Sequence, residues 1–172
     1  KGGIGKTLLI ANLSIFLTQL GKRVLLIDAD LGGANLHTCL GILPPSVTIG
    51  DFMMRKVVNI NDVVVDTDIP NLSLITGPLN FLGAANPKHA QKMKVLKEIR
   101  SLGFDFVLLD IGSGTSNNIL DFFLSSDKGL IVVLPEPTSV ENAYRFLKCA
   151  FIRRCWNVVR DQGLREVVRD AI

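Results

Sequence analysis

The stretch KGGIGKT, residues 1–7, is the most informative part of the sequence. Its three glycines and two lysines lead into an apolar run that predicts a helix over 6–20. Glycines let backbone N–H groups approach phosphate oxygens closely, and the N-terminal end of a helix favours the same anion. Gly5, Lys6 and Thr7 supply the last three positions of the phosphate-binding pattern G-x-x-x-x-G-K-[ST]. The stretch therefore predicts that Lys6 reaches the β- and γ-phosphates and that the Thr7 hydroxyl coordinates Mg²⁺.

Length and composition favour a globular protein. Of 172 residues, 48% are hydrophobic and 20% are charged, and no apolar run approaches the roughly 18–20 residues of a membrane span. The formal net charge is +3, and residues 141–172 carry seven Lys or Arg against four Asp or Glu. We interpret this basic region as a solvated helix face, and the alternative is a contact surface for DNA, anionic lipid or an acidic partner. Three cysteines without a C-x-x-C pair indicate reduced thiols rather than a disulfide framework.

Buried strands alternate with helices along the chain. Continuous apolar runs predict strands at 23–28, 104–110 and 129–134, and an alternating run predicts another at 71–76. The helices predicted between and after them cover 36–41, parts of 49–66, 87–102, 118–125 and a long segment from Val140. This order predicts a mostly parallel α/β sheet in a single domain over 1–172. The core is expected to contain Phe16, Phe52, Phe106, Phe122, Phe123 and Phe146.

Carboxylates stand at the ends of two of these strands. Asp28 and Asp30 belong to DADLGGANL, residues 28–36, and Asp110 ends the run FDFVLLD. In open α/β sheets, ligands bind outside the carboxyl ends of the strands. Taken alone, the D-x-D pattern is more typical of a capped strand end. Beside a phosphate loop it suits hydrolysis, because an attacking water needs a carboxylate that orients it or accepts its proton.

The additional lysine at position 1 makes the loop KGGxGKT, the deviant Walker A signature. With this loop the chain resembles the MinD/ParA family of dimerising ATPases, which have a three-layer P-loop NTPase fold. The resemblance implies that Lys1 reaches the nucleotide of a partner subunit, so that ATP and Mg²⁺ hold a homodimer together until hydrolysis to ADP. It implies that the nucleotide contacts run through Gly2, Gly3, Ile4, Gly5, Lys6, Thr7 and Leu8.

The strand-end segments resemble the other motifs of that family. By resemblance to switch I, Asp30 holds the attacking water, Asp28 lies near the outer shell of the metal, and Asn35 supports the site. FDFVLLD resembles Walker B, in which Asp110 binds Mg²⁺ through a water. IGSGTSNN, residues 111–118, resembles switch II, with the Gly112 backbone placed to sense the γ-phosphate. PEPTSVENAYRFLK, residues 135–148, resembles the turn and helix near the dimer interface.

Within the family the chain looks closest to the FlhG/FleN-like branch, which regulates flagellar number. The resemblance implies a bacterial, cytoplasmic switch that positions the division site, flagella or partitioned DNA with an activating protein partner. It also implies a strand before Lys1 and a later segment that contacts adenine and, in MinD, carries an amphipathic membrane helix. We therefore expect residues 1–172 to be a fragment and membrane association, if present, to be peripheral and outside them.

Three alternatives remain open at this point. An ATP-dependent iron–sulfur carrier would share the loop, but none of Cys39, Cys149 and Cys155 follows the Walker B segment. A ParA-like segregation ATPase would bind DNA nonspecifically through the basic 145–169 surface. A degenerate copy of the family would not bind nucleotide at all.

Overall fold

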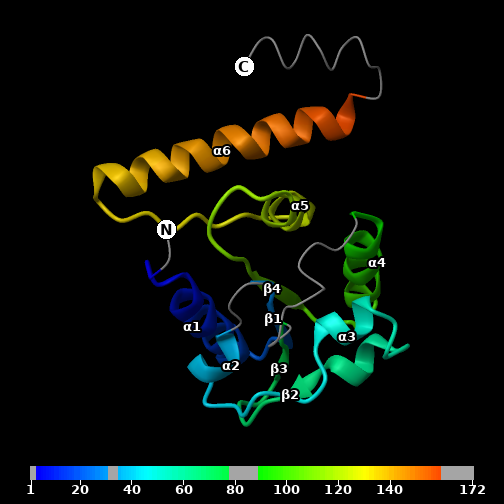
Figure 1. Ribbon diagram of the computed structural model, residues 1–172. Coiled ribbons are helices and arrows are strands. Elements are labelled where there is room, and N and C mark those ends of the chain that lie inside the picture. The colour runs from blue at the N-terminus through cyan, green and yellow to red at the C-terminus, as the bar shows by residue number, and fades with distance from the viewer. Residues whose placement is uncertain (1–2, 31–34, 78–88, 160–172) are drawn as a thin grey trace. The chain divides into compact units, whose positions relative to one another are not determined.

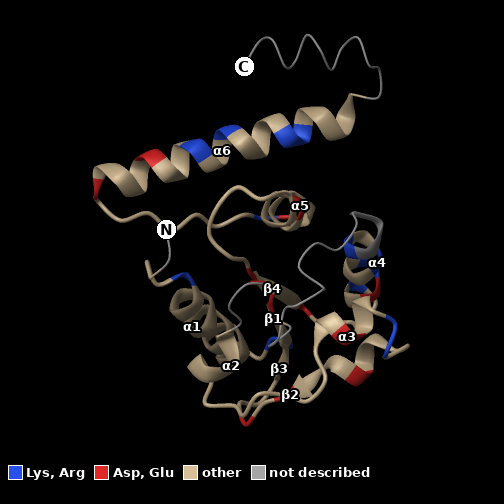
Figure 2. Cartoon of the chain, in the orientation of Figure 1, with Lys and Arg blue, Asp and Glu red and all other residues tan. Residues whose placement is uncertain are grey.

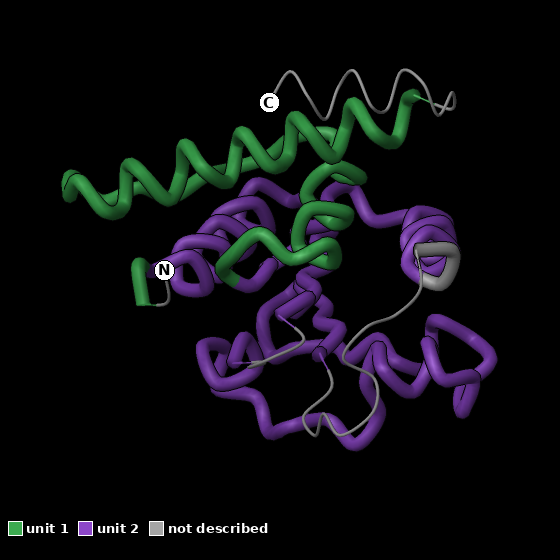
Figure 3. The backbone as a smooth tube through the Cα atoms, turned by 45° about the horizontal axis from the view of Figure 1, so that its top comes forward, with its two compact units in different colours: residues 1–4, 113–172 green, residues 5–112 purple. Residues whose placement is uncertain are grey.

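The computed structural model describes residues 3–30, 35–77 and 89–159. The chain forms two compact units, one of Gly5–Gly112 and one of Lys1–Ile4 with Ser113–Ile172 (Figure 3). The larger unit contains the sheet, and the described part of the smaller unit contains two helices. The single domain expected from the sequence stays a prediction.

A four-stranded, mostly parallel sheet forms the centre of the larger unit (Figure 1). Its order is β2 (Val65–Asp66), β3 (Leu72–Ile75), β1 (Val24–Asp28) and β4 (Phe106–Asp110). β1 pairs in parallel with β3 and with β4, whereas the short β2 is antiparallel to β3. The three parallel strands were predicted, β1 and β4 by continuous apolar runs and β3 by an alternating run. β2 was not predicted, because its two residues are too few to show a period.

Helices cover both faces of this sheet, which gives three layers. α1 (Lys6–Gln19) and α2 (Leu36–Cys39) pack on one face, against the alternate strand residues Val24, Leu26, Leu72 and Leu74. α3 (Ile49–Met53), the 3₁₀ turn η1 (Ile60–Val63) and α4 (His89–Arg100) pack on the other, against Leu25, Ile27 and Ile75. All five residues of β1 are buried, as a continuous apolar run predicts for a strand covered on both faces.

The smaller unit pairs α5 (Asn117–Ser125) with α6 (Pro137–Val158). The guanidinium of Arg153 on α6 donates to both carboxylate oxygens of the buried Asp121 on α5, at 3.0 and 3.3 Å. The rings of Phe123 and Phe146 meet edge to face with their centroids 4.9 Å apart. An ion pair and an aromatic pair therefore join the two helices.

The predicted strand over 129–134 is wrong. These residues adopt no regular structure, and the Leu130 side chain is 73% exposed. The described part of the smaller unit is helical, so it offers no strand whose backbone groups could pair with this run. An apolar run shows that a segment tends to be buried, but a strand forms only where a paired neighbour exists.

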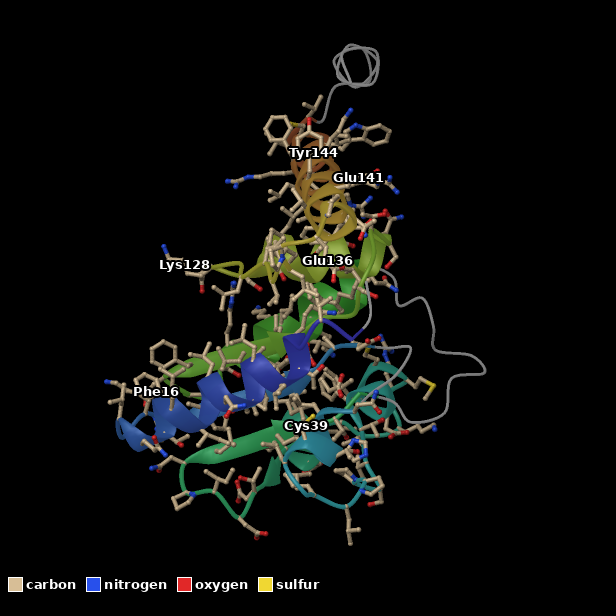
Figure 4. The ribbon with its side chains drawn as sticks, turned by 90° about the vertical axis from the view of Figure 1, so that its left-hand side faces the viewer. Phe16, Cys39, Lys128, Glu136, Glu141 and Tyr144 are labelled. Atoms are coloured by element: carbon tan, nitrogen blue, oxygen red, sulfur yellow. The ribbon has the colours of Figure 1, made fainter. Side chains whose placement is uncertain are left out.

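For two of the phenylalanines expected in the core, the prediction of burial is wrong as well. Phe52 and Phe122 are buried, whereas Phe16 is 54% exposed and Phe106 is also exposed. The buried residues of α1 are Ala11, Ser14 and Thr18, and the hydroxyls of Ser14 and Thr18 donate to carbonyls one turn back. Phe16 lies two positions from both Ser14 and Thr18, so it projects from the opposite side of the helix (Figure 4).

The basic character expected in the late helix is visible on α6 (Figure 2). Arg145 pairs with Glu141 at 2.8 Å, and Arg153 pairs with Asp121. Two of its cationic side chains are therefore engaged within the unit. Among the described helices, none combines the length and the apolar character that a bilayer span requires.

Candidate nucleotide-binding site

The parallel register of β1 and β4 brings two buried carboxylates together. Asp28 and Asp110 are paired in register at the carboxyl ends of these strands, and their exposed fractions are only 1% and 6%. The N–H of Ala29 donates to the Asp110 carbonyl at 2.8 Å, which holds the two strand ends side by side. The sequence predicted both side chains, and the structure brings them to one edge of the sheet, where open α/β folds bind ligands.

The turn before α1 has the backbone of an anion site. Gly5 lies in the left-handed region with φ 86° and ψ 14°, and it directly precedes the first residue of the helix. No side chain among the described residues caps the first turn of α1, so its N–H groups are available to a ligand at the positive end of the helix dipole. Such a turn and helix end together suit a phosphate group.

Thr7 and Lys6 connect α1 to the end of β4. The Thr7 hydroxyl donates a hydrogen bond to the Asp110 carboxylate, and the Lys6 ammonium acts on the same group through its charge. Burial raises the pKa of Asp110, and this effect outweighs the lowering by Thr7 and Lys6. A cation placed beside this carboxylate would remove part of the cost of its ionisation.

Asp28 holds both sides of the predicted switch I loop. Its Oδ1 accepts from the N–H of Asp30 at 3.1 Å, and its Oδ2 accepts from the N–H of Leu36 at 3.0 Å. Burial raises the pKa of Asp28 to about 6, against the lowering by these two backbone donors, and the charges of Asp110 and Asp30 add to the increase. The sequence did not predict that the Leu36 N–H binds Asp28. Every residue except proline carries an N–H, so the residue type does not indicate which amide will contact a given carboxylate.

Asp30 and Gly112, one residue from each predicted switch segment, lie close together in the larger unit. A Cβ added at Gly112 would lie 2.9 Å from Oδ1 and 3.0 Å from Cγ of Asp30. Both distances are too short for ordinary packing, so only glycine leaves the Asp30 carboxylate in this position. The roles predicted for the two residues require that they be close to each other, and the structure meets this requirement.

Other predicted residues are not joined to this cluster. Lys1 and Gly2 lie outside the described residues, and Gly3 and Ile4 belong to the smaller unit. Leu8 is exposed on α1, and Asn35 is exposed at the start of α2, where its carbonyl accepts from Cys39. Their roles stay predictions.

The donor set at this edge suits Mg²⁺. One threonine hydroxyl and two buried carboxylates are hard oxygen ligands, and Mg²⁺ in nucleotide sites uses one or two protein oxygens with phosphates and waters. Thr7 and Asp110 would hold the metal, with Asp28 behind them. Within the described ranges, no three His, Cys, Asp or Glu side chains are grouped to hold a metal by themselves.

A glycine turn before a helix, a lysine and a threonine in its first turn, and carboxylates at neighbouring strand ends define the P-loop class of nucleotide-binding proteins. A family model described as "AAA domain" matches residues 1–157, and the chain belongs to this family. The antiactivator FleN of Pseudomonas aeruginosa is 32% identical, over 86% of this chain and 52% of the relative.

Solved structures of MinD are similar in fold. MinD of Pyrococcus horikoshii OT3 complexed with Mg-ADP has a TM-score of 0.76 and 28% identity, over 87% of this chain and 62% of that one. MinD in the MinC:MinD complex of Aquifex aeolicus has a TM-score of 0.73 and 32% identity, over 86% and 59%. The MinD/ParA resemblance and the P-loop NTPase fold are thereby confirmed. The chain spans about half the length of the curated relatives it matches.

Proposed function

We propose that this protein binds ATP with Mg²⁺ and hydrolyses it to ADP and phosphate. The observation that carries the proposal is the hydrogen bond between Thr7 and Asp110, which joins the glycine turn and α1 to the buried carboxylates of the sheet edge. The FleN and MinD relatives, and a MinD structure that contains Mg-ADP, support the same ligand class.

Each residue of the cluster has a task in this reaction. The N–H groups at the start of α1 and the Lys6 ammonium bind the β- and γ-phosphates. Thr7 and Asp110 would hold Mg²⁺, and the ion would supply positive charge against the negative charge that develops during transfer. Asp30, beside the Gly112 backbone, holds a water in line with the γ-phosphorus and accepts its proton as the oxygen attacks. Asp28 fixes the two backbone segments on which this geometry depends.

The proposal extends to ATP-dependent dimerisation. In the MinD/ParA pattern, the early lysine of one subunit reaches the nucleotide of the other, so Lys1 would complete the site across a face-to-face homodimer. Hydrolysis would then be slow until a partner stabilises the closed arrangement, because positioning and charge neutralisation account for most of the catalysis in phosphoryl transfer.

The cellular role that fits these relatives is spatial regulation through a recruited protein. One relative is named an antiactivator, and one solved MinD is in complex with MinC. We infer a bacterial, cytoplasmic switch of the FleN/MinD type, whose ATP-bound dimer recruits its partner and which associates peripherally with membranes.

Calorimetric titration of the full chain with Mg-ATP tests the proposal directly. Lys6→Ala should remove the binding heat, while Lys22→Ala, on the exposed turn that follows α1, should leave it unchanged. Sizing with ATP, with ADP and without nucleotide, each with and without anionic vesicles, then tests dimerisation and membrane association. A wild-type chain that is folded and shows no heat with Mg-ATP or Mg-ADP would overturn the assignment.

A further inference from the structure

A fully buried hydroxyl lies at the same edge of the sheet as the nucleotide site, and none of the contacts of that site involves it. Thr76 follows the last residue of β3, and its exposed fraction is 0%. Its Oγ1 has no hydrogen-bond partner among the described residues. A buried donor without a partner destabilises the folded state, and such groups are rare in native proteins. A hydroxyl retained under these conditions calls for an explanation in another state of the protein.

The register of the sheet places Thr76 beside Asp28. Ile75 is the partner of Ile27 in the parallel pairing of β3 with β1, so the next residues along the two strands are Thr76 and Asp28. The Asn71 carbonyl accepts from Val24 on β1, whereas the Thr76 carbonyl accepts from Ile49 on α3. Carbonyls alternate in direction along an extended chain. A Thr76 carbonyl that does not point to β1 agrees with continued alternation through this residue.

The two side chains also share a face of the sheet. Leu26 and Leu74, two residues before Asp28 and Thr76, both pack on the α1 and α2 side, and side chains two apart along a strand point the same way. Asp28 reaches toward this region, because its Oδ2 accepts from the N–H of Leu36, which packs over Leu72 and Leu74. Neighbouring strands lie about 4.8 Å apart, so rotation about χ1 of Thr76 is enough to change which groups its hydroxyl meets.

We propose that Thr76 is a positioning residue of the nucleotide site, whose hydroxyl donates to the Asp28 carboxylate once Mg²⁺ and the nucleotide phosphates are bound. This inference rests on the proposed function. A carboxylate has about four lone-pair positions, of which the Asp30 and Leu36 amides use two. A hydrogen bond from a hydroxyl to a carboxylate is short and strong, so the Thr76 hydroxyl at the neighbouring strand end is suited to one of the remaining positions. The Thr76 bond would then hold Asp28, and through it both sides of the switch I loop.

Two substitutions separate this role from a purely structural one. Thr76→Val keeps the shape of the side chain and removes the hydroxyl, so the nucleotide-free protein should be as stable as the wild type or more stable. Its affinity for Mg-ADP should fall about tenfold, the size expected for the loss of one hydrogen bond to a charged group. Thr76→Ser keeps the hydroxyl and loses a buried methyl, so it should lower the melting temperature and retain the affinity. A change in stability alone could not produce these opposite patterns.

Thr18→Val is the matched control. Thr18 is also buried in the larger unit, but its hydroxyl already donates to the Ile15 carbonyl at 2.7 Å, near the C-terminal end of α1. This variant should lose stability and bind Mg-ADP as the wild type does. The measurements are melting without ligand and calorimetric titration of the full chain with Mg-ADP.

The outcomes distinguish the two proposals. If the wild type binds Mg-ADP and Thr76→Val binds it equally well, the inference about Thr76 is wrong and the nucleotide site stands. If Thr76→Val loses stability as Thr18→Val does, the hydroxyl already has a partner without nucleotide, and the inference is again wrong. If the folded wild type binds no nucleotide, the proposed function fails, and the role of Thr76 fails with it.

Discussion

The hydroxyl of Thr7 donates a hydrogen bond to the carboxylate of Asp110, and this contact joins the first turn of α1 to the carboxyl end of β4. The phosphate loop and the Walker B strand are about a hundred residues apart in the chain, yet this one contact makes them parts of the same site. Burial keeps the contact away from bulk water, since Asp110 is almost fully covered. Hydrogen bonds to charged groups are strongest under such conditions.

Removal of this contact should weaken nucleotide binding. Thr7→Val keeps the shape of the side chain and deletes the hydroxyl, which leaves Asp110 buried with one donor fewer. We expect the affinity for Mg-ADP to fall at least about tenfold, because a metal ligand and a hydrogen bond are lost together. Calorimetric titration measures this, with Thr7→Ser as the variant that should restore affinity. Wild-type affinity in Thr7→Val would show that the hydroxyl has no part in the site.

Protonation of Asp28 should make the site sensitive to pH. Its pKa of about 6 in the folded protein lies above the value of 3.8 for an unperturbed aspartate. Between these values the folded state binds more protons than the unfolded state, so the stability of the nucleotide-free protein falls as pH rises from 4 to 6. The total effect is about 3 kcal/mol at most, because one pKa unit corresponds to about 1.4 kcal/mol.

Mg²⁺ requires the ionised carboxylate, so binding should respond to pH in the opposite direction. We expect the increase in melting temperature caused by Mg-ADP to be larger at pH 7 than at pH 5. Asp28→Asn should flatten this dependence and should also stabilise the nucleotide-free protein at pH 7, because no buried charge remains. Comparison with that variant corrects for protonation of the nucleotide itself. An equal pH dependence in both proteins would be evidence against Asp28 as its source.

Gly112→Ala should displace Asp30. The added methyl would lie 2.9 Å from Oδ1 of Asp30, and this partly exposed side chain can move away from it. We expect the fold to be retained and kcat to fall more than KM rises, because the attacking water loses its orientation while the phosphate contacts remain. In an Asp30→Ala background the same substitution should have little further effect on kcat. If the two substitutions lower kcat additively, Gly112 does not act through the position of Asp30.

Asp30→Ala should separate nucleotide binding from hydrolysis. Its carboxylate is the group assigned to the attacking water, and none of the contacts assigned to the phosphates involves it. The variant should bind Mg-ATP and accumulate as a dimer that the wild type forms only transiently, which sizing in the presence of ATP would reveal. Unchanged turnover would mean that another carboxylate orients the water.

Lys1→Ala should prevent formation of the ATP-bound dimer that Asp30→Ala is expected to accumulate. If Lys1 acts only on the partner subunit, one chain of the variant should still bind ATP, but the dimer should not form and hydrolysis should stop. Sizing and phosphate release measured on the same samples test this, with Lys22→Ala as a control for the loss of one positive charge. A stable ATP dimer of the Lys1 variant would contradict the role across the interface.

Much of the site could be read from local patterns. Residues 5–7 predicted the phosphate loop, and an acid at the end of two apolar runs predicted the neighbouring carboxylates Asp28 and Asp110. Prediction failed where the outcome depends on what lies opposite a residue. Phe16 is exposed because it lies on the side of α1 opposite the buried Ser14 and Thr18. The run 129–134 forms no strand because no described neighbour pairs with it. The sequence shows a hydroxyl residue, Thr76, at the end of the predicted strand 71–76. It does not show that this hydroxyl is buried without a partner.

The sequence by itself determined the residue types of the phosphate loop, the positions of the three parallel strands, and the family. It could do so because backbone freedom, charge and apolar period are properties of neighbouring residues. Only the tertiary structure decided that Asp28 lies beside Asp110, that Leu36 binds Asp28 through its N–H, and that Thr76 is buried without a partner. These features arise from the register between strands and from burial, both of which depend on segments that are distant in the chain.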